Sequence, residues 1–183
     1  DGLGYPAWHT GLTIAVVSVT TLVVAPVSGS LSDRIGTRLL CTAGISLICI
    51  ALLLISRLDL QSSTADVVLR LVLFGIGSGL FQSPNNSSIL GAAPRDRLGT
   101  ASAMLATVRQ VGISLGVAAS GTLFAGYRAS FAAKLAESSA DPSMIGKLSL
   151  VSSFQDTLLI AFAICSIGIV TSLARGKGRN GRQ

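Results

Sequence analysis

The chain has 183 residues, of which 12% are charged and 50% are hydrophobic, and its mean hydropathy is +0.68. A soluble protein of this length carries about a quarter of its residues as charges over its whole surface. Here the charges are clustered and leave long uncharged stretches, which excludes a water-soluble fold. The net charge of +6 comes with few aromatic residues and no extended basic face, which argues against a nucleic-acid-binding protein.

Five apolar stretches are long enough to cross the bilayer as helices. A spanning helix needs about 20 apolar residues, and in lipid the backbone must satisfy its own hydrogen bonds, which favours helices over strands. The expected spans are residues 10–30, 39–56, 67–84, 100–124 and 154–174, followed by a tail at 175–183. The longest connector is 127–153, with room for a short surface helix at 130–137. The sequence therefore predicts an all-α integral membrane protein.

The basic residues are divided unequally between the two sides of the membrane. With five spans, segments 32–38, 91–99 and 175–183 share one side and hold eight basic residues against two acidic ones. The other side holds five basic residues against six acidic ones. Because basic residues concentrate on the cytoplasmic side, we expect the N-terminus outside and the tail in the cytoplasm, in the inner or plasma membrane of the cell.

The chain opens at Asp1, with no initiator Met and no basic segment before its first apolar stretch. No signal peptide is expected from this pattern. We expect residues 1–183 to be the interior of a longer reading frame or a processed product.

A short string with two glycines joins the first two spans. It reads GSLSDRIGTR and begins at residue 29. Gly29 and Gly36 allow close helix approach and a sharp turn, and Asp33 is placed to face the next helix N-terminus, whose dipole favours a carboxylate. Arg34 and Arg38 can pair with Asp33 or with lipid phosphates. A positive-inside turn with a helix cap would also account for the string.

The same string resembles the loop signature of the major facilitator superfamily, commonly written G-x-L-x-D-R-x-G-R-[RK]. It departs from that signature at Thr37, where the family has a basic residue. The resemblance implies that Asp33 and the basic residues form a conformational latch, which holds neighbouring helices together in one access state and loosens in the other.

Two further strings extend the resemblance along the chain. The third span ends in FGIGSGLFQSPNN, and the next connector and span carry PRDRLGTASA and RQVGISLG. Together they resemble the C-terminal half of the fourteen-helix drug:proton antiporters of the superfamily. The resemblance implies a mostly apolar central cavity, alternating access, and small amphipathic molecules and protons as partners. It also implies that the N-terminal half of the same transporter is missing from this chain.

Several polar residues in these strings are candidates for the cavity or gate: Gln82, Pro84, Asn85, Asn86, Arg109 and Gln110. The two asparagines either satisfy backbone groups left free around the proline or contact a substrate. Arg109 lies inside the fourth span, where a charge is costly unless it is paired or hydrated. It is either a snorkelling residue or structural lock, or a residue of the cavity or gate.

Asp156 is the candidate for proton coupling. Proton antiport requires a group that titrates as access alternates, and Asp156 stands at the expected outer start of the last span. An N-terminal helix charge at the membrane interface is the alternative.

Small residues form two stripes that predict helix packing. Gly75, Gly77 and Gly79 lack the third glycine of a nucleotide-binding loop, and they favour tight contact with neighbouring helices. Gly112 and Gly116, continued by Ser120, predict a second packing face within the bundle.

No nucleophile–base pair, metal cluster or phosphate loop is evident in the sequence. We therefore expect no enzyme activity, no metal and no cofactor. The predicted function is that of a part of a proton-coupled multidrug exporter. A family importer or exporter of a metabolite or sugar, and a non-transporting membrane assembly factor, are the alternatives.

Overall fold

The computed structural model describes residues 7–58, 62–137 and 142–174, and these form five long helices with no strand among them. The helices are α1 (Ala7–Ile35), α2 (Thr37–Ile55), α3 (Thr64–Gly91), α4 (Leu98–Glu137) and α5 (Pro142–Ala174), with a 3₁₀ turn η1 (Arg95–Arg97) before α4. Each is long and apolar enough to cross a membrane. The predicted all-α fold class with five spans is confirmed.

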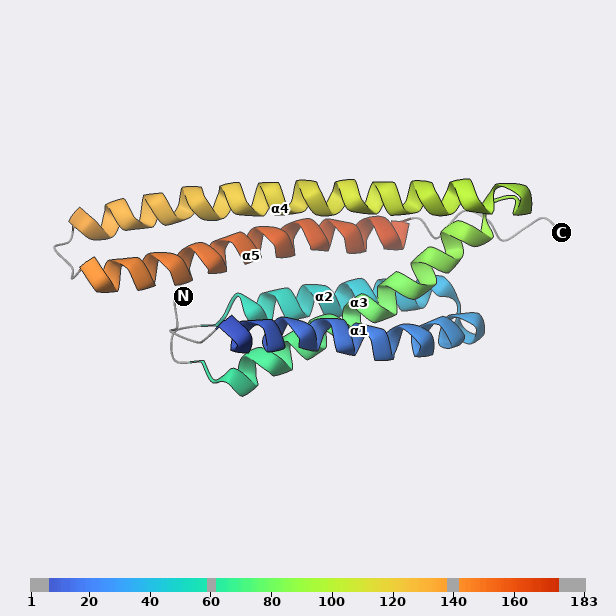
Figure 1. The fold of residues 1–183 in the computed structure, drawn as a ribbon, viewed down its shortest axis with the longest axis horizontal. Coiled ribbons are helices and arrows are strands. Elements are labelled where there is room, and N and C mark those ends of the chain that lie inside the picture. The colour runs from blue at the N-terminus through green and yellow to red at the C-terminus, as the bar shows by residue number, and fades with distance from the viewer. Residues whose placement is uncertain (1–6, 59–61, 138–141, 175–183) are drawn as a thin grey trace.

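The helices run alternately up and down along a common axis (Figure 1). α3 packs against both α1 and α2, α5 packs against α2, and α4 packs along α5. α4 is therefore the outermost helix, and its side away from α5 is uncovered in this chain. The turn between α1 and α2 and the turn between α3 and α4 lie at the same end of the molecule. We call this the basic end, after the arginines of the two turns: Arg34, Arg38, Arg95 and Arg97.

The glycines of α3 allow it to pack closely against two helices at once. A Cβ placed on Gly75 would lie 2.8 Å from the Thr20 Cβ of α1, and one placed on Gly77 would lie 2.9 Å from the Gly44 carbonyl oxygen of α2. In turn, a Cβ on Gly44 would lie 2.7 Å from the Phe81 backbone nitrogen. These contacts leave no room for a larger residue, so the predicted packing role of the α3 glycines is confirmed.

The turn between α1 and α2 depends on Gly36. Its φ of +91° is a backbone conformation that other residues rarely adopt. The Gly36 N–H donates to the Ser32 carbonyl at 2.9 Å, which closes the end of α1, and α2 begins one residue later. The sequence predicted a sharp turn here, and the structure has one.

The helices extend well beyond the expected spans. α4 continues to Glu137 and α5 already begins at Pro142, so most of the expected connector 127–153 is helical, and the separate surface helix at 130–137 is the end of α4. Hydropathy marks the part of a helix that lies in hydrocarbon, whereas the helix itself can continue into the interface. The tail 175–183 lies outside the described residues.

Candidate functional site

The loop signature occupies the end of α1, the turn and the start of α2. Asp33 and Arg34 lie exposed in the last turn of α1. No side chain caps the N-terminus of α2 by a hydrogen bond, so the helix-cap interpretation of this string is not observed, and the dipole role of Asp33 stays a prediction. A Cβ on Gly29 would lie 3.0 Å from the Ser83 Oγ, so the close approach of Gly29 is to α3.

Arg38 of the signature and Asn85 of α3 line the same open groove, which has a volume of about 770 Å³. The groove lies between α2 and α3 at the basic end, with α5 contributing Gly168. The sequence analysis treated the signature and the polar end of the third span as separate features. The antiparallel packing of α2 and α3 brings them together.

The other polar candidates of α3 are placed differently. Pro84 is fully buried, while Gln82 and Asn86 are half-buried and do not line the groove. Within the described part of the chain, neither asparagine amide bonds to backbone freed by the proline. Of the two interpretations offered for the asparagines, the backbone-satisfying one is not observed.

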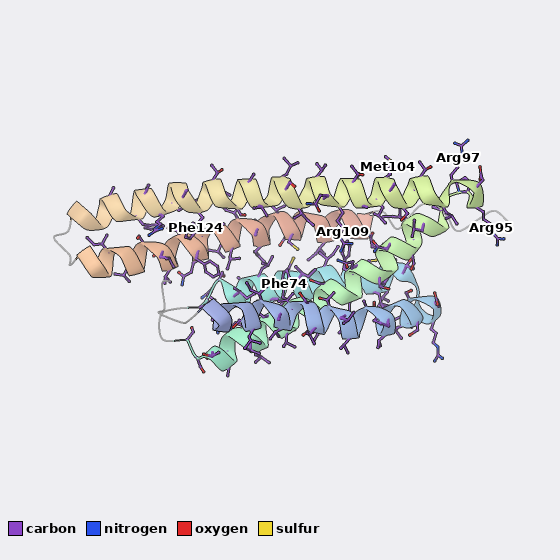
Figure 2. All side chains as sticks on the ribbon, viewed as in Figure 1. Phe74, Arg95, Arg97, Met104, Arg109 and Phe124 are labelled. Atoms are coloured by element: carbon purple, nitrogen blue, oxygen red, sulfur yellow. The ribbon has the colours of Figure 1, made fainter. Side chains whose placement is uncertain are left out.

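Arg109 lies in α4, roughly three turns from Leu98, and its side chain is exposed in this chain. Figure 2 shows it on the side of α4 that faces α5 and α3, whereas Met104 lies on the opposite side. Among the residues that the structure describes, its guanidinium has no hydrogen-bond or ion-pair partner. Gln110 is exposed as well.

Asp156 lies far from any helix end. α5 begins at Pro142, so Asp156 stands roughly four turns into the helix and inside the apolar segment Leu148–Ile169. The interpretation as an N-terminal helix charge is therefore wrong, because the helix starts much earlier than its apolar part suggested. Asp156 is half-buried.

Several polar contacts between helices were not predicted from the sequence, three of which involve an arginine, a glutamine and a buried serine. The Arg70 guanidinium of α3 donates to the Leu54 carbonyl in the last turn of α2 at 2.8 Å, and the Gln155 amide of α5 donates to the Leu58 carbonyl at 2.8 Å. The buried Ser28 hydroxyl of α1 donates to the Gly79 carbonyl of α3 at 2.9 Å. These bonds join α1, α2, α3 and α5 through backbone acceptors.

At the basic end Arg97 and Asp96 form an ion pair at 3.7 Å, with both side chains 76% exposed. An exposed pair of this kind contributes little to stability. No group of three or more metal-ligating side chains occurs in the described ranges. What the geometry presents is thus a polar groove, a charge within an apolar helix and an uncovered helix face.

This arrangement defines a polytopic α-helical membrane protein whose polar side chains lie inside and between its spans. A family model described as Major Facilitator Superfamily matches residues 1–135. The chain belongs to this superfamily.

Several curated proteins are similar to the chain. The riboflavin transporter RibZ of Clostridioides difficile (strain 630) is 37% identical over 115 residues, which cover 63% of this chain and 25% of that protein. The multidrug resistance protein Stp of Mycobacterium tuberculosis is 33% identical over 124 residues, covering 68% and 23%. The lincomycin resistance protein LmrB of Listeria innocua is 23% identical over 173 residues, covering 94% and 36%.

The chain spans about a quarter of the length of RibZ and of Stp. The relatives are named as transporters or resistance proteins, and none of the three is named as an enzyme.

Proposed function

We propose that the chain is the C-terminal portion of a proton-coupled multidrug exporter. Two relatives named for resistance to multiple drugs and to lincomycin support drug export. The observation that carries the proposal is Arg109, a charge placed inside a long apolar helix with no partner among the described residues. Such a residue needs a counter-charge or water, and a transport pathway supplies both.

The depth of Arg109 favours a cavity over the membrane interface. Eleven residues separate it from Leu98, which is about 16 Å along a helix axis and about half of a 30 Å hydrocarbon core. η1, with exposed Arg97, marks where the chain leaves the membrane. We therefore assign Arg109 to the wall or gate of the central cavity, with Gln110 beside it.

Asp156 is the candidate for proton exchange within this chain. It is a half-buried carboxylate inside an apolar helix, and intramembrane carboxylates form the proton relays of pumps and transporters. Asp33, at the basic end, keeps its proposed part in the conformational latch.

The proposed orientation places the basic end in the cytoplasm and the first residues outside, in the plasma or inner membrane. Four arginines and two aspartates lie in or next to the two turns at this end, as expected from the excess of basic residues on the cytoplasmic side. The uncovered side of α4 is then where the missing N-terminal half of the transporter packs.

The test is drug efflux by the complete protein that carries residues 1–183, reconstituted in proteoliposomes with a pH gradient. We expect Arg109→Ala to reduce efflux of an amphipathic dye at least tenfold, since removing the charge changes the hydrated wall of the cavity. Asp156→Asn should leave dye binding intact and abolish the dependence of efflux on the pH gradient. Arg97→Ala, which removes an exposed arginine at the basic end, is the matched control.

Wild-type efflux in both Arg109→Ala and Asp156→Asn, at equal amounts of folded protein, would show that these residues have no role in transport beyond structure. Dye efflux that is indifferent to the pH gradient in the unaltered protein would rule out proton coupling.

Transport of a metabolite is the second candidate, favoured by the identity of 37% to a protein named as a riboflavin transporter. The same proteoliposomes distinguish the two. Riboflavin flux without dye flux supports transport of a metabolite, and dye flux without riboflavin flux supports drug export.

A further inference from the structure

The α2 wall of the groove at the basic end changes from polar to apolar along its length. On α2 its wall begins with Thr37 and Arg38 and continues through Cys41 to Ile45. Arg38 and Ile45 are seven residues apart, or about 10 Å along the helix axis. The charged side chain is therefore near the end of the span, while the aliphatic one lies deeper.

The wall formed by α3 also has polar side chains near the end. Ser88 and Asn85 line the groove near the end, where Ile89 and Ala92 line it as well, and Phe81 lines it further in. The Cys41 thiol lies 3.8 Å from the Phe81 carbonyl oxygen, which fixes the two helices in this register. Both walls thus include hydrogen-bonding groups near the basic end, and Ile45 and Phe81 line the groove further in.

The third helix leaves the inner part of the groove open. α5 contributes Gly168, and a Cβ placed there would have no atom within 4 Å. The absence of a side chain at this position leaves space beside Ile45 and Phe81, so a flexible apolar chain can enter between α5 and the other two helices.

We propose that this groove binds an anionic phospholipid from the leaflet at the basic end. The phosphate lies against the Arg38 guanidinium, the Asn85 amide and the Ser88 hydroxyl, and one acyl chain runs along Ile45 and Phe81 past Gly168. Basic pockets between membrane-spanning helices bind anionic lipid headgroups in this way, and bonds from arginine to phosphate are among the stronger hydrogen bonds in proteins.

The charges of the groove and of its surroundings favour an anionic headgroup over a zwitterionic one. Among the described residues no acidic side chain lines the groove. Around the two turns at the same end, Arg34, Arg95 and Arg97 outnumber Asp33 and Asp96. The inference needs only that α2, α3 and α5 span the membrane. It takes the identity of the leaflet from the proposed orientation, and it does not depend on which molecule is transported.

The experiment is native mass spectrometry of the complete protein with dioleoyl phosphatidylglycerol, together with thermal unfolding at increasing amounts of that lipid. Dioleoyl phosphatidylcholine and inorganic phosphate serve as separate arms. We expect one tightly held phosphatidylglycerol and a rise in the unfolding temperature that saturates with it. Arg38→Ala should weaken this binding by roughly fivefold or more, as removal of one arginine near an anionic headgroup predicts.

Two further variants separate the groove from general surface charge. Arg97→Ala removes the same charge from the same end, outside the groove and 76% exposed, and should bind the lipid as the unaltered protein does. Gly168→Leu keeps every charge and fills the space for the acyl chain, so it should lose the bound lipid while the protein stays folded.

Equal weakening by Arg38→Ala and Arg97→Ala would overturn the proposal, because the attraction would then be a property of the surface. Equal binding of phosphatidylcholine would overturn the recognition of an anionic headgroup. Stabilisation by millimolar phosphate alone, lost in Arg38→Ala and unaffected by Gly168→Leu, would identify a site for a free anion instead of a lipid. Each of these results leaves the efflux experiment unaffected.

Discussion

At the scale of single residues, Arg70 is the side chain whose role the structure defines most sharply. Its guanidinium donates to the Leu54 carbonyl at 2.8 Å, in the last turn of α2, where backbone carbonyls carry a partial negative charge. The same carbonyl also accepts the backbone N–H of Arg57 at 3.2 Å. The bond from Arg70 joins α3 to α2 at the end opposite the groove. It adds a second, charged donor to this carbonyl and offsets the helix dipole.

We predict that Arg70→Ala lowers the free energy of unfolding by about 1 kcal/mol, which is the usual contribution of a hydrogen bond in proteins. Denaturation of the complete protein in detergent, followed by circular dichroism, measures this difference. Arg57→Ala is the control, since Arg57 lies at the same end, is exposed and makes no ion pair among the described residues. Equal effects of the two substitutions would show that net charge, not the bond to Leu54, is responsible.

For such contacts the sequence indicates the donor residue but not its acceptor. An arginine near the start of an apolar span needs a partner, and Arg70 could have been singled out on that ground. Its acceptor could not have been predicted, because every residue has a backbone carbonyl and only the tertiary arrangement selects Leu54. The same holds for Gln155, whose acceptor Leu58 lies 97 residues away in the chain.

At the scale of helices, the close packing of α3 against α2 depends on a pair of facing glycines. A Cβ on Gly77 would lie 2.9 Å from both the Gly44 carbonyl oxygen and the Ile48 backbone nitrogen. Backbone atoms of a packed helix cannot move aside as a flexible side chain can, so any substitution must push the two helices apart.

We predict that Gly77→Ala destabilises the protein by about 2 to 3 kcal/mol, the upper part of the range for overpacked cores. The yield of monodisperse protein and the denaturation midpoint measure the effect. Gly146→Ala is the matched control, since a Cβ there meets nothing within 4 Å in α5, and alanine is the better helix former. A Gly77→Ala protein as stable as the control would mean that α2 and α3 pack less closely than described.

Helix identity was predictable from the sequence, whereas helix ends and helix partners were not. Apolar length alone predicted all five helices, because a bilayer allows the backbone few alternatives. It did not predict that α5 begins at Pro142, and this error misplaced Asp156. Likewise, the spacing of Gly112 and Gly116 shows that they share a face of α4, but spacing cannot name what packs there.

At the scale of the whole molecule, the uncovered face of α4 is the feature that the five helices leave unexplained. A Cβ on Gly112, Gly116 or Gly121 would meet nothing within 4 Å. Large apolar residues of the same helix are also exposed, Leu115 by 65% and Val117 by 67%. Gly116 lies seven residues, or about two turns, after Arg109 and therefore shares its side of α4, yet no described residue would contact a Cβ at Gly112 or Gly116. The predicted packing within the bundle is therefore not observed among the described helices.

If the remaining helices of the transporter pack on this face, as the proposed function requires, then a larger side chain at Gly116 should act only through them. Small residues let membrane helices approach closely without a hydrophobic driving force. We predict that Gly116→Leu in the complete protein lowers dye efflux at least tenfold and lowers the unfolding temperature, whereas Gly116→Ala has an intermediate effect. The comparison uses equal amounts of protein in the membrane.

The control for this substitution is Gly146→Leu, which adds the same side chain at a glycine of α5 that is equally open in this chain. It should retain efflux, because α5 already has its neighbours in α2 and α4. Full efflux in Gly116→Leu would show that the open face of α4 lies against lipid. The missing half would then have to pack against α1 and α3, and Arg109, on the side of α4 that faces α5 and α3, would need a counter-charge from within these five helices.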